Sequence, residues 1–267
     1  MNLSGKRIIL TGAAGGIGYH LSKLLAARGA HLALVERNAT RLEEICAEIN
    51  HNGGSATAIA LDLTSEGAAA RIIEAASQAM GGFDIVINNA GLLDFTLYEN
   101  QAPERIAQII NLNVLAPMLL VRAALPTLLA QNSGRIVNIG STFGSIGFPH
   151  FSSYCASKFA IRGFSEALGR ELADSRVGVS YVSPRATRTP LNDALTSQMH
   201  LETKTNLDEP DYVAAQIVQA IEQEAKEYFI GQPESFFARL NGVFPRLVDG
   251  GLLKNTRIAR KYAQLKK

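Results

Sequence analysis

Short apolar runs of strand length alternate with longer segments in which apolar residues recur at every third or fourth position. The first pattern predicts buried strands and the second predicts amphipathic helices. Strands are expected at residues 7–11, 31–36, 57–61, 84–88, 135–139, 177–182 and 227–230, and helices at 19–28, 40–50, 65–80, 103–131, 151–172 and 211–224. Strands separated by helices pair in parallel through right-handed crossovers. The pattern therefore predicts an α/β protein built on a parallel sheet.

Candidate functional residues follow the predicted strands. Because ligands bind at the carboxyl ends of parallel strands, these residues are expected to meet at one edge of the sheet. They are Gly12, Glu36, Asp62, Asn89, Ser141 and Pro184. Two segments are less regular: residues 191–210 are polar and show no periodicity, and Pro117 and Pro126 are expected to bend or break the helix at 103–131.

A glycine-rich turn at residues 12–18 joins the first strand to the first helix. Glycines let the backbone approach a pyrophosphate, and the N-terminus of a helix offers free N–H groups to it. Glycines also make ordinary turns, but this turn lies between a strand and a helix. That position predicts a dinucleotide site containing Gly12, Gly16, Ile17 and Gly18.

Tyr154 and Lys158 are four residues apart in a predicted helix, so their side chains share one face. An ammonium beside a phenol favours the phenolate and lowers the phenol pKa from its usual value of about 10. Tyr154 could then act as a general acid or base. The pair by itself is common by chance, and an exposed helix face is the alternative interpretation.

Five motifs, in this order, resemble those of the short-chain dehydrogenase/reductase family in its compact form. They are the turn from Thr11 to Gly18, Asp62 with Leu63, residues 88–91, Asn113, and Ser141 with Tyr154 and Lys158, and they lie within residues 4–190. The resemblance implies a single domain with a doubly wound, Rossmann-type sheet of seven strands. Residues 1–190 would bind the cofactor and carry catalysis, and residues 191–267 would form a helical substrate lid and C-terminal part.

The resemblance also implies a role for each matched residue. Ser141 would orient the substrate oxygen, Tyr154 would pass the proton, and Lys158 would bind the ribose hydroxyls and keep the tyrosine ionisable. Asn113 would support a water chain from Lys158 to solvent. The remaining cofactor residues would be Asp62 and Leu63 beside the adenine, Asn89, Ala90 and Gly91 along the adenosine, and Pro184, Thr187 and Thr189 near the nicotinamide.

Arg185 departs from the family pattern, which has glycine after Pro184. A fixed cation at this position is expected to contact an anionic group of the cofactor or of the substrate. Phe143 is expected to line the substrate pocket together with Ile146, Phe148 and Phe151, which predicts an apolar substrate of medium or greater length. A dimer contact through the same side chains is the alternative.

Glu36 ends the second strand, where an acidic side chain accepts hydrogen bonds from the adenosine ribose hydroxyls. A 2′-phosphate at this place would be repelled by the carboxylate. Arg37 follows at once and could bind such a phosphate, as arginines do in NADP-using relatives. The fixed carboxylate of Glu36 is expected to outweigh the mobile side chain of Arg37, so NAD(H) is the predicted cofactor and NADP(H) the alternative.

Composition adds few constraints. The chain has 267 residues, a net charge of +2 and 47% apolar residues, which fits one α/β domain without a nucleic-acid partner. Cys46 and Cys155 give no disulfide framework, and the histidines show no metal-ligand spacing. Only His150 could approach the substrate, and a place in a surface turn is the favoured interpretation for it. With no signal peptide and no apolar run long enough for a membrane span, a cytoplasmic location is expected.

Two surfaces are candidates for association. The helices at 103–131 and 151–173 are more apolar than one buried face requires, which predicts a homodimer or homotetramer. The basic segment at 254–267 is helical in pattern. It could pack as an ordinary helix, form a lid or a subunit contact, or associate weakly with a membrane surface.

The sequence therefore predicts a nicotinamide-dependent alcohol dehydrogenase or ketone reductase. One alternative is an acyl-thioester ketoreductase of lipid or polyketide synthesis. Another is a non-catalytic nucleotide-binding sensor or scaffold, which the intact Ser141, Tyr154 and Lys158 oppose because a sensor needs no proton donor. The fold itself does not determine the substrate.

Overall fold

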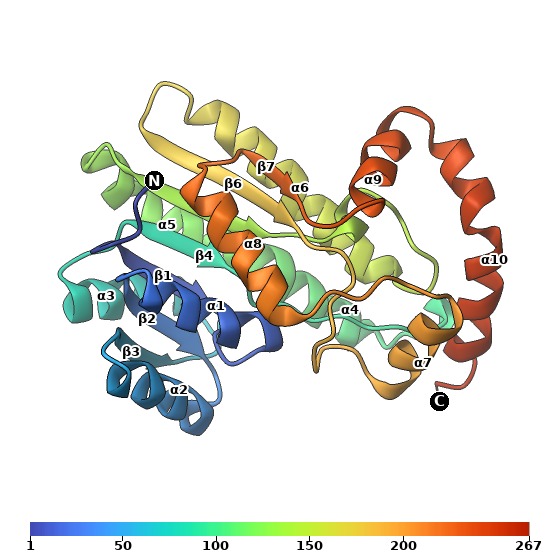
Figure 1. The fold of residues 1–267 in the computed structure, drawn as a ribbon, viewed down its shortest axis with the longest axis horizontal. Coiled ribbons are helices and arrows are strands. Elements are labelled where there is room, and N and C mark those ends of the chain that lie inside the picture. Colours follow the sequence, from blue (N-terminus) through green and yellow to red (C-terminus); the bar gives the residue numbers. More distant parts are fainter. Residues whose placement is uncertain (267) are drawn as a thin grey trace.

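A parallel sheet of seven strands forms the centre of the computed structural model, which describes residues 1–266 (Figure 1). The strands are β1 (Arg7–Thr11), β2 (His31–Glu36), β3 (Ser55–Ala60), β4 (Ile85–Asn88), β5 (Gly134–Ile139), β6 (Val177–Ser183) and β7 (Glu227–Phe229). Their order across the sheet is β3-β2-β1-β4-β5-β6-β7, and every neighbouring pair is parallel. The predicted fold class is confirmed.

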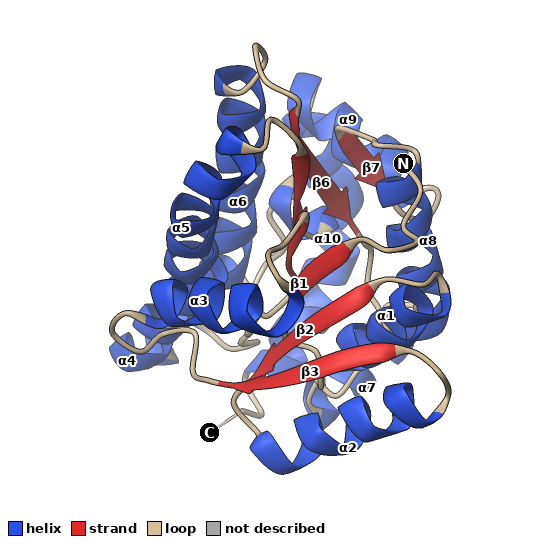
Figure 2. Ribbon diagram, turned by 90° about the vertical axis from the view of Figure 1, so that its left-hand side faces the viewer, coloured by secondary structure: helices blue, strands red, loops and turns tan. Residues whose placement is uncertain are grey.

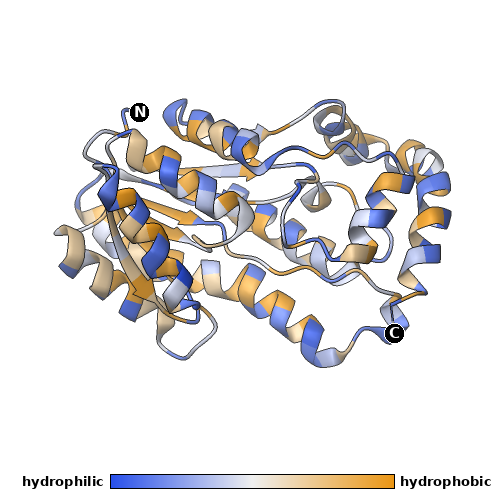
Figure 3. Cartoon of the chain, turned by 60° about the horizontal axis from the view of Figure 1, so that its bottom comes forward, coloured by the Kyte–Doolittle hydropathy of each residue, from blue (hydrophilic) through white to orange (hydrophobic). Residues whose placement is uncertain are grey.

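Helices cover both faces of this sheet (Figure 2). One layer holds α3 (Ala68–Met80), α4 (Pro103–Ile110), α5 (Ala116–Ala130) and α6 (Ser152–Glu171), and the other holds α1 (Gly16–Ala27), α2 (Ala39–His51) and α8 (Pro210–Glu222). Ile8 and Leu10 of β1 pack with the α1 layer, whereas Ile9 packs with the α3 layer. The apolar strands therefore lie between two layers of helices, and each helix carries both hydrophilic and hydrophobic residues (Figure 3).

The apolar segment predicted as one helix at 103–131 is divided by a π-helical turn, Asn111–Leu115. Pro117 does not break the helix, because it lies in the first turn of α5, where no N–H donor is needed. Pro126 lies inside α5. Within the described residues, the segment Pro103–Ala130 is long and apolar enough to cross a membrane by length and composition alone. Its inner face packs on the sheet through Leu120 and Leu128, as a core helix does.

Three further helices lie beyond the carboxyl ends of the strands: α7 (Ala194–Glu202), α9 (Glu234–Val243) and α10 (Pro245–Ala263) (Figure 1). The sequence predicted no element for α7, which begins where the Asp193 side chain accepts a hydrogen bond from the Thr196 N–H at 2.7 Å. Lys266 follows α10, and its Nζ lies 2.7 Å from a carboxylate oxygen of Asp94 and 3.2 Å from one of Asp193. Lys266 therefore ties the segment after α10 to the loop after β4 and to the start of α7.

Candidate active site

A cavity of about 660 Å³ opens at the carboxyl ends of the central strands, a size typical of small-molecule sites. It lies where the strand order reverses between β1 and β4, the usual ligand position in such sheets. The predicted catalytic and cofactor-binding residues, together with Phe143 and Arg185, all line it except Asn113: Gly12, Gly16, Ile17, Gly18, Glu36, Arg37, Asp62, Leu63, Asn89, Ala90, Gly91, Ser141, Phe143, Tyr154, Lys158, Pro184, Arg185, Thr187 and Thr189.

The glycine turn has no room for side chains. A Cβ on Gly12 would lie 2.7 Å from the Cα of Ala90, and one on Gly18 would lie 2.0 Å from the carbonyl oxygen of Gly12. Gly12 also has a φ of +67°, which favours glycine. No side chain caps the start of α1, so the first N–H groups of this helix are available to an anion at the cavity wall.

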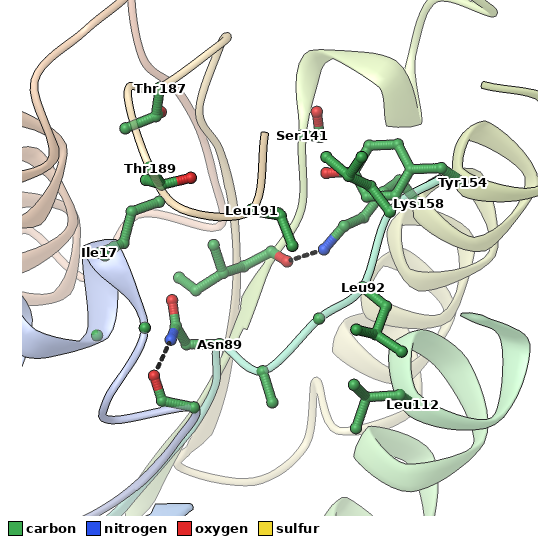
Figure 4. Close-up of a pocket in the computed structure, with 18 of the residues that line it drawn as sticks. Ile17, Asn89, Leu92, Leu112, Ser141, Tyr154, Lys158, Thr187, Thr189 and Leu191 are labelled. Carbon is green, nitrogen blue, oxygen red and sulfur yellow. Dashed lines mark hydrogen bonds between the residues drawn. The ribbon is translucent and has the colours of Figure 1, made fainter. Parts of the chain in front are cut away.

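Hydrogen bonds join the glycine turn to the loop after β4. Asn89 Nδ2 donates to the carbonyl oxygens of Thr11 at 3.1 Å and Gly12 at 3.0 Å (Figure 4). The hydroxyl of Thr11 accepts from the N–H groups of Asn89 at 3.1 Å and Ala90 at 3.2 Å. Two loops far apart in the sequence thus form one rigid wall.

Glu36, Arg37 and Asp62 lie at the end of the cavity nearest β2 and β3. A carboxylate oxygen of Glu36 accepts the Arg37 N–H at 2.9 Å. Asp62 accepts the hydroxyl of Thr64 at 2.7 Å and its N–H at 2.8 Å, and these bonds, with the nearby charge of Arg37, hold the Asp62 pKa below its usual value. Within residues 1–266 Arg37 makes no salt bridge.

Ser141, Tyr154 and Lys158 meet at the opposite end of the cavity (Figure 4). Ser141 directly follows β5, and the other two belong to α6. A buried amide ladder fixes this helix on the sheet: Asn88 Nδ2 donates to Asn138 Oδ1, and Asn138 Nδ2 donates to the hydroxyl of Ser165, both at 2.8 Å. The side chains of Ser141, Tyr154 and Lys158 are therefore held by three neighbouring elements, β4, β5 and α6.

Burial dominates the charge states of this group. It raises the pKa of Tyr154, which a hydrogen bond with Ser141 partly opposes, and it lowers the pKa of Lys158 to about 8. Lys158 Nζ donates to the carbonyl oxygen of Ile139 at 3.0 Å and lies 5.7 Å from the centre of the Tyr154 ring. The expectation that Lys158 lowers the pKa of Tyr154 is wrong for the protein without bound cofactor. Burial desolvates both side chains, and the ammonium of Lys158 donates to the carbonyl of Ile139.

Asn113 lies behind the cavity wall in the π-helical turn. Its Oδ1 accepts the Leu92 N–H at 2.7 Å, and its Nδ2 donates to the Leu92 carbonyl at 2.8 Å and to the Ser157 hydroxyl at 2.9 Å. A Cβ on Gly91 would lie 3.4 Å from Asn113 Oδ1 and 3.8 Å from Lys158 Nζ. Asn113 thus braces the loop after β4 against α6, and its part in a water chain stays a prediction.

Arg185 differs from the expectation. Its Nε and Nη2 bind the two carboxylate oxygens of Asp208 at 2.9 and 2.7 Å, and its Nη1 binds Glu234 at 2.9 Å. These carboxylates raise the pKa of Arg185. The guanidinium is thus paired within the protein, where it ties the segment after β6 to the start of α9, and its contact with an anionic ligand stays a prediction.

The substrate end of the cavity is only partly the one predicted. Phe143 and Phe151 line it, and Phe148 stacks on Phe143 from behind, with ring centres 5.2 Å apart. Ile146 and His150 do not line it. The sequence reasoning missed the lining residues Leu92, Leu93, Arg105, Asn111, Leu112, Leu191, Asn192 and His200.

Comparison with known proteins agrees with this geometry. The family model for short chain dehydrogenase matches residues 6–200. The ketoacyl reductase HetN of a Nostoc species is 32% identical over 231 residues, covering 86% of this chain and 80% of the relative. The 3-oxoacyl-(acyl-carrier-protein) reductase of Vibrio cholerae is 30% identical over 203 residues, covering 76% and 82%.

Solved structures give the same result. A short-chain dehydrogenase/reductase from Burkholderia phymatum in complex with NAD superposes with a TM-score of 0.86 at 22% identity, covering 92% of this chain and 96% of that one. A short-chain dehydrogenase from Sphingobium yanoikuyae in complex with NADPH gives a TM-score of 0.78 at 28% identity, covering 91% and 95%. The chain therefore belongs to the short-chain dehydrogenase/reductase family and is an NAD(P)-dependent oxidoreductase that acts on CH–OH or keto groups.

Proposed function

We propose that the protein exchanges hydride between a nicotinamide cofactor and an apolar alcohol or ketone, with Tyr154 passing the proton. The observation that carries this proposal is the single cavity that joins an uncapped glycine turn at one end to Ser141, Tyr154 and Lys158 at the other. Such a cavity suits a long dinucleotide with its reactive end beside a proton donor. The region after residue 190, with α7 and α10, would then close the substrate end.

A nicotinamide dinucleotide fits the residues present. The N–H groups at the start of α1 would hold its pyrophosphate, Asp62 and Asn89 its adenosine side, and Lys158 its nicotinamide ribose. Thr187 and Thr189 would contact the carboxamide end. The nicotinamide, when bound, supplies or accepts the hydride.

The proton moves through the protein's own groups. In reduction, Ser141 and the Tyr154 hydroxyl would hydrogen-bond the ketone oxygen, and the phenol would donate its proton to that oxygen as the alcohol forms. A ribose-bound ammonium of Lys158 would then stabilise the phenolate that remains. Oxidation of an alcohol is the reverse, with Tyr154 as the base.

Tyr154→Phe tests this role. We expect cofactor binding to be kept and turnover to fall by roughly 100- to 10,000-fold, since the ring stays and the proton donor is lost. Turnover is measured on a panel of ketones and alcohols with NAD(H) and NADP(H). Tyr212→Phe, at an exposed position of α8, is the matched control. Wild-type rates in Tyr154→Phe on an accepted substrate would refute the mechanism.

We propose NAD(H) as the preferred cofactor. Glu36 ends β2 at the cavity wall and would accept hydrogen bonds from the ribose hydroxyls, while its charge would oppose a 2′-phosphate. Arg37 is free to turn towards such a phosphate. Glu36→Ala should improve kcat/KM for NADP(H) and lower it for NAD(H), with Glu43→Ala on the exposed side of α2 as the control. A wild-type preference for NADP(H) would show that Arg37 sets the choice.

The apolar nature of the substrate is a further part of the proposal. Phe143, Phe151, Leu93 and Leu191 line the cavity near the catalytic group, and apolar walls with few polar groups suit apolar ligands. A clear preference for sugars or for charged ketones in the panel would contradict it.

An acyl-thioester ketoreductase is the second candidate. It is favoured by the names of two relatives, a ketoacyl reductase and a 3-oxoacyl-(acyl-carrier-protein) reductase. A short β-ketoacyl thioester in the same panel separates it from a simple ketone reductase. A sensor or scaffold is disfavoured because Ser141 lines the same cavity as the buried Tyr154 and Lys158, and a sensor needs no proton donor.

We also propose self-association through α4, α5 and α6. Ile110 of α4, Met118 and Leu119 of α5, and Phe159 of α6 are more than one-third exposed. Leu119→Glu should lower the sedimentation coefficient at micromolar concentration, and Leu253→Glu on exposed α10 should not. A monomeric wild type would end this proposal.

A cytoplasmic location is proposed from the two buried, unbridged cysteines, Cys46 and Cys155. We also propose that the basic residues near the end of α10 bind weakly to anionic membrane surfaces. Sedimentation with anionic vesicles tests it, and recovery of all the protein in the supernatant would rule it out.

A further inference from the structure

His200 is a buried imidazole at the wall of the active-site cavity. It lies near the end of α7, and its side chain is only 6% exposed. Its Nδ1 is buried with no hydrogen-bond partner. Its Nε2 also bonds to no residue between 1 and 266 but is not fully buried, so it is the nitrogen that a ligand in the cavity can reach. The function assigned above makes no use of this side chain.

Its neighbourhood belongs to the substrate end of the cavity. The preceding residue, Met199, packs in one apolar cluster with Phe151 and Tyr154. Leu191 and Asn192, which lie just before α7, line the same cavity. His200 therefore borders the space beside the proton donor, far along the chain from the glycine turn.

The imidazole needs partners that the protein does not give it. Burial lowers the His200 pKa, so the ring is neutral and offers one N–H donor and one acceptor. Of the hydroxyls on α7 or at its C-terminal end, Thr203 Oγ1 donates to the Met199 carbonyl at 2.8 Å, and Thr196 Oγ1, one turn before His200, is itself buried without a partner. A ligand that hydrogen-bonds Nε2 would gain roughly 0.5–1.5 kcal/mol over water at the same place.

We propose that His200 hydrogen-bonds an uncharged oxygen group, a hydroxyl or a second carbonyl, that the substrate carries apart from the carbon exchanging hydride. This rests on the proposed hydride transfer. A neutral imidazole is complementary to both groups, and the apolar side chains of Phe143, Phe151 and Leu93, which line the same cavity, disfavour a charged one. The substrate would be an apolar ketone or alcohol with a second oxygen, and His200 would determine this specificity.

Equilibrium binding tests the proposal without relying on turnover. Calorimetry on the Tyr154→Phe protein saturated with NADH compares a medium-chain methyl ketone with ketones of equal length that carry one hydroxyl or one further carbonyl at successive positions. At least one oxygenated ketone should bind roughly 10-fold more tightly than its parent, the equivalent of one recovered hydrogen bond. His200→Leu should abolish this gain and leave the affinity for the parent unchanged.

His200→Asn is the conservative variant, because its amide keeps a donor and an acceptor. It should retain part of the higher affinity for the oxygenated ketone. If His200→Leu does not fold, His200→Asn is used for the test instead. The proposal is overturned if no oxygenated ketone gains affinity, or if the gain survives in His200→Leu. NADH affinity, followed by nicotinamide fluorescence in a chain without tryptophan, must stay unchanged; a weaker value would make His200 a cofactor contact instead. Failure of the hydride-transfer mechanism shows separately, as turnover surviving in Tyr154→Phe.

Discussion

Replacing Lys158 by methionine should stabilise the cofactor-free protein while removing its activity. Burial lowers the Lys158 pKa from 10.5 to about 8, and at 1.36 kcal/mol per unit the buried ammonium costs about 3 kcal/mol near neutral pH. Methionine removes this charge but leaves the Ile139 carbonyl without its donor, a loss of about 1 kcal/mol. The net gain is about 2 kcal/mol, or roughly 4–8 °C in Tm for a chain of this size.

The pH dependence identifies the cause. The unfolded chain keeps the lysine proton up to pH 10.5, whereas the folded chain loses it near pH 8, so unfolding takes up a proton between these values. Wild-type stability therefore rises across this window. The advantage of Lys158→Met should shrink as the pH rises through it and become a disadvantage of about 1 kcal/mol above it.

Urea unfolding at equal protein concentration, at pH 7 and near pH 10, measures this difference. Lys254→Met is the matched control, because Lys254 is exposed and makes no salt bridge within residues 1–266. Its effect should be small at both pH values. A less stable Lys158→Met protein at pH 7, or a difference that does not change with pH, would refute the reasoning.

Two further substitutions test the packing of the site. Arg185→Met should destabilise the protein by about 3 kcal/mol in urea unfolding, because it leaves the buried Asp208 carboxylate unpaired. Arg188→Met, at an exposed position, should change the stability little. Weaker cofactor binding with unchanged stability would instead show that Arg185 binds an anionic ligand. Gly18→Ala should weaken NADH binding by at least roughly 10-fold, because its Cβ would lie 2.0 Å from a carbonyl oxygen and displace the turn, whereas Gly250→Ala in open space should not; unchanged affinity would show that the turn can adjust.

The strands and the residues that follow them could be predicted because each is a local pattern. An apolar run such as residues 135–139 identifies a buried strand without knowledge of its neighbours. Parallel pairing then brings the carboxyl ends together, which is why Ser141 and Asn89 line one cavity. The glycine turn needed only the strand before it and the helix after it.

Other features depend on contacts between distant parts of the chain. The partners of Arg185 lie 23 and 49 residues away, so its position alone suggested a free cation. The pKa of Tyr154 is governed by burial, which helix spacing does not reveal. His200 lies in a polar segment without periodicity, and only its burial beside the cavity distinguishes it from a surface histidine.

The ion pairs of Lys266 have a consequence for biosynthesis. This residue bridges Asp94 of the loop after β4 and Asp193 at the start of α7. Domains fold as units, and the core beneath α1 closes only after α8 has been made, because Val213 and Ile217 of α8 belong to it. The substrate side is fastened later still, once Lys266 has left the ribosome. A chain cut just before Lys266 would therefore keep its core but lose these ion pairs, and it should change substrate selection before it changes cofactor binding.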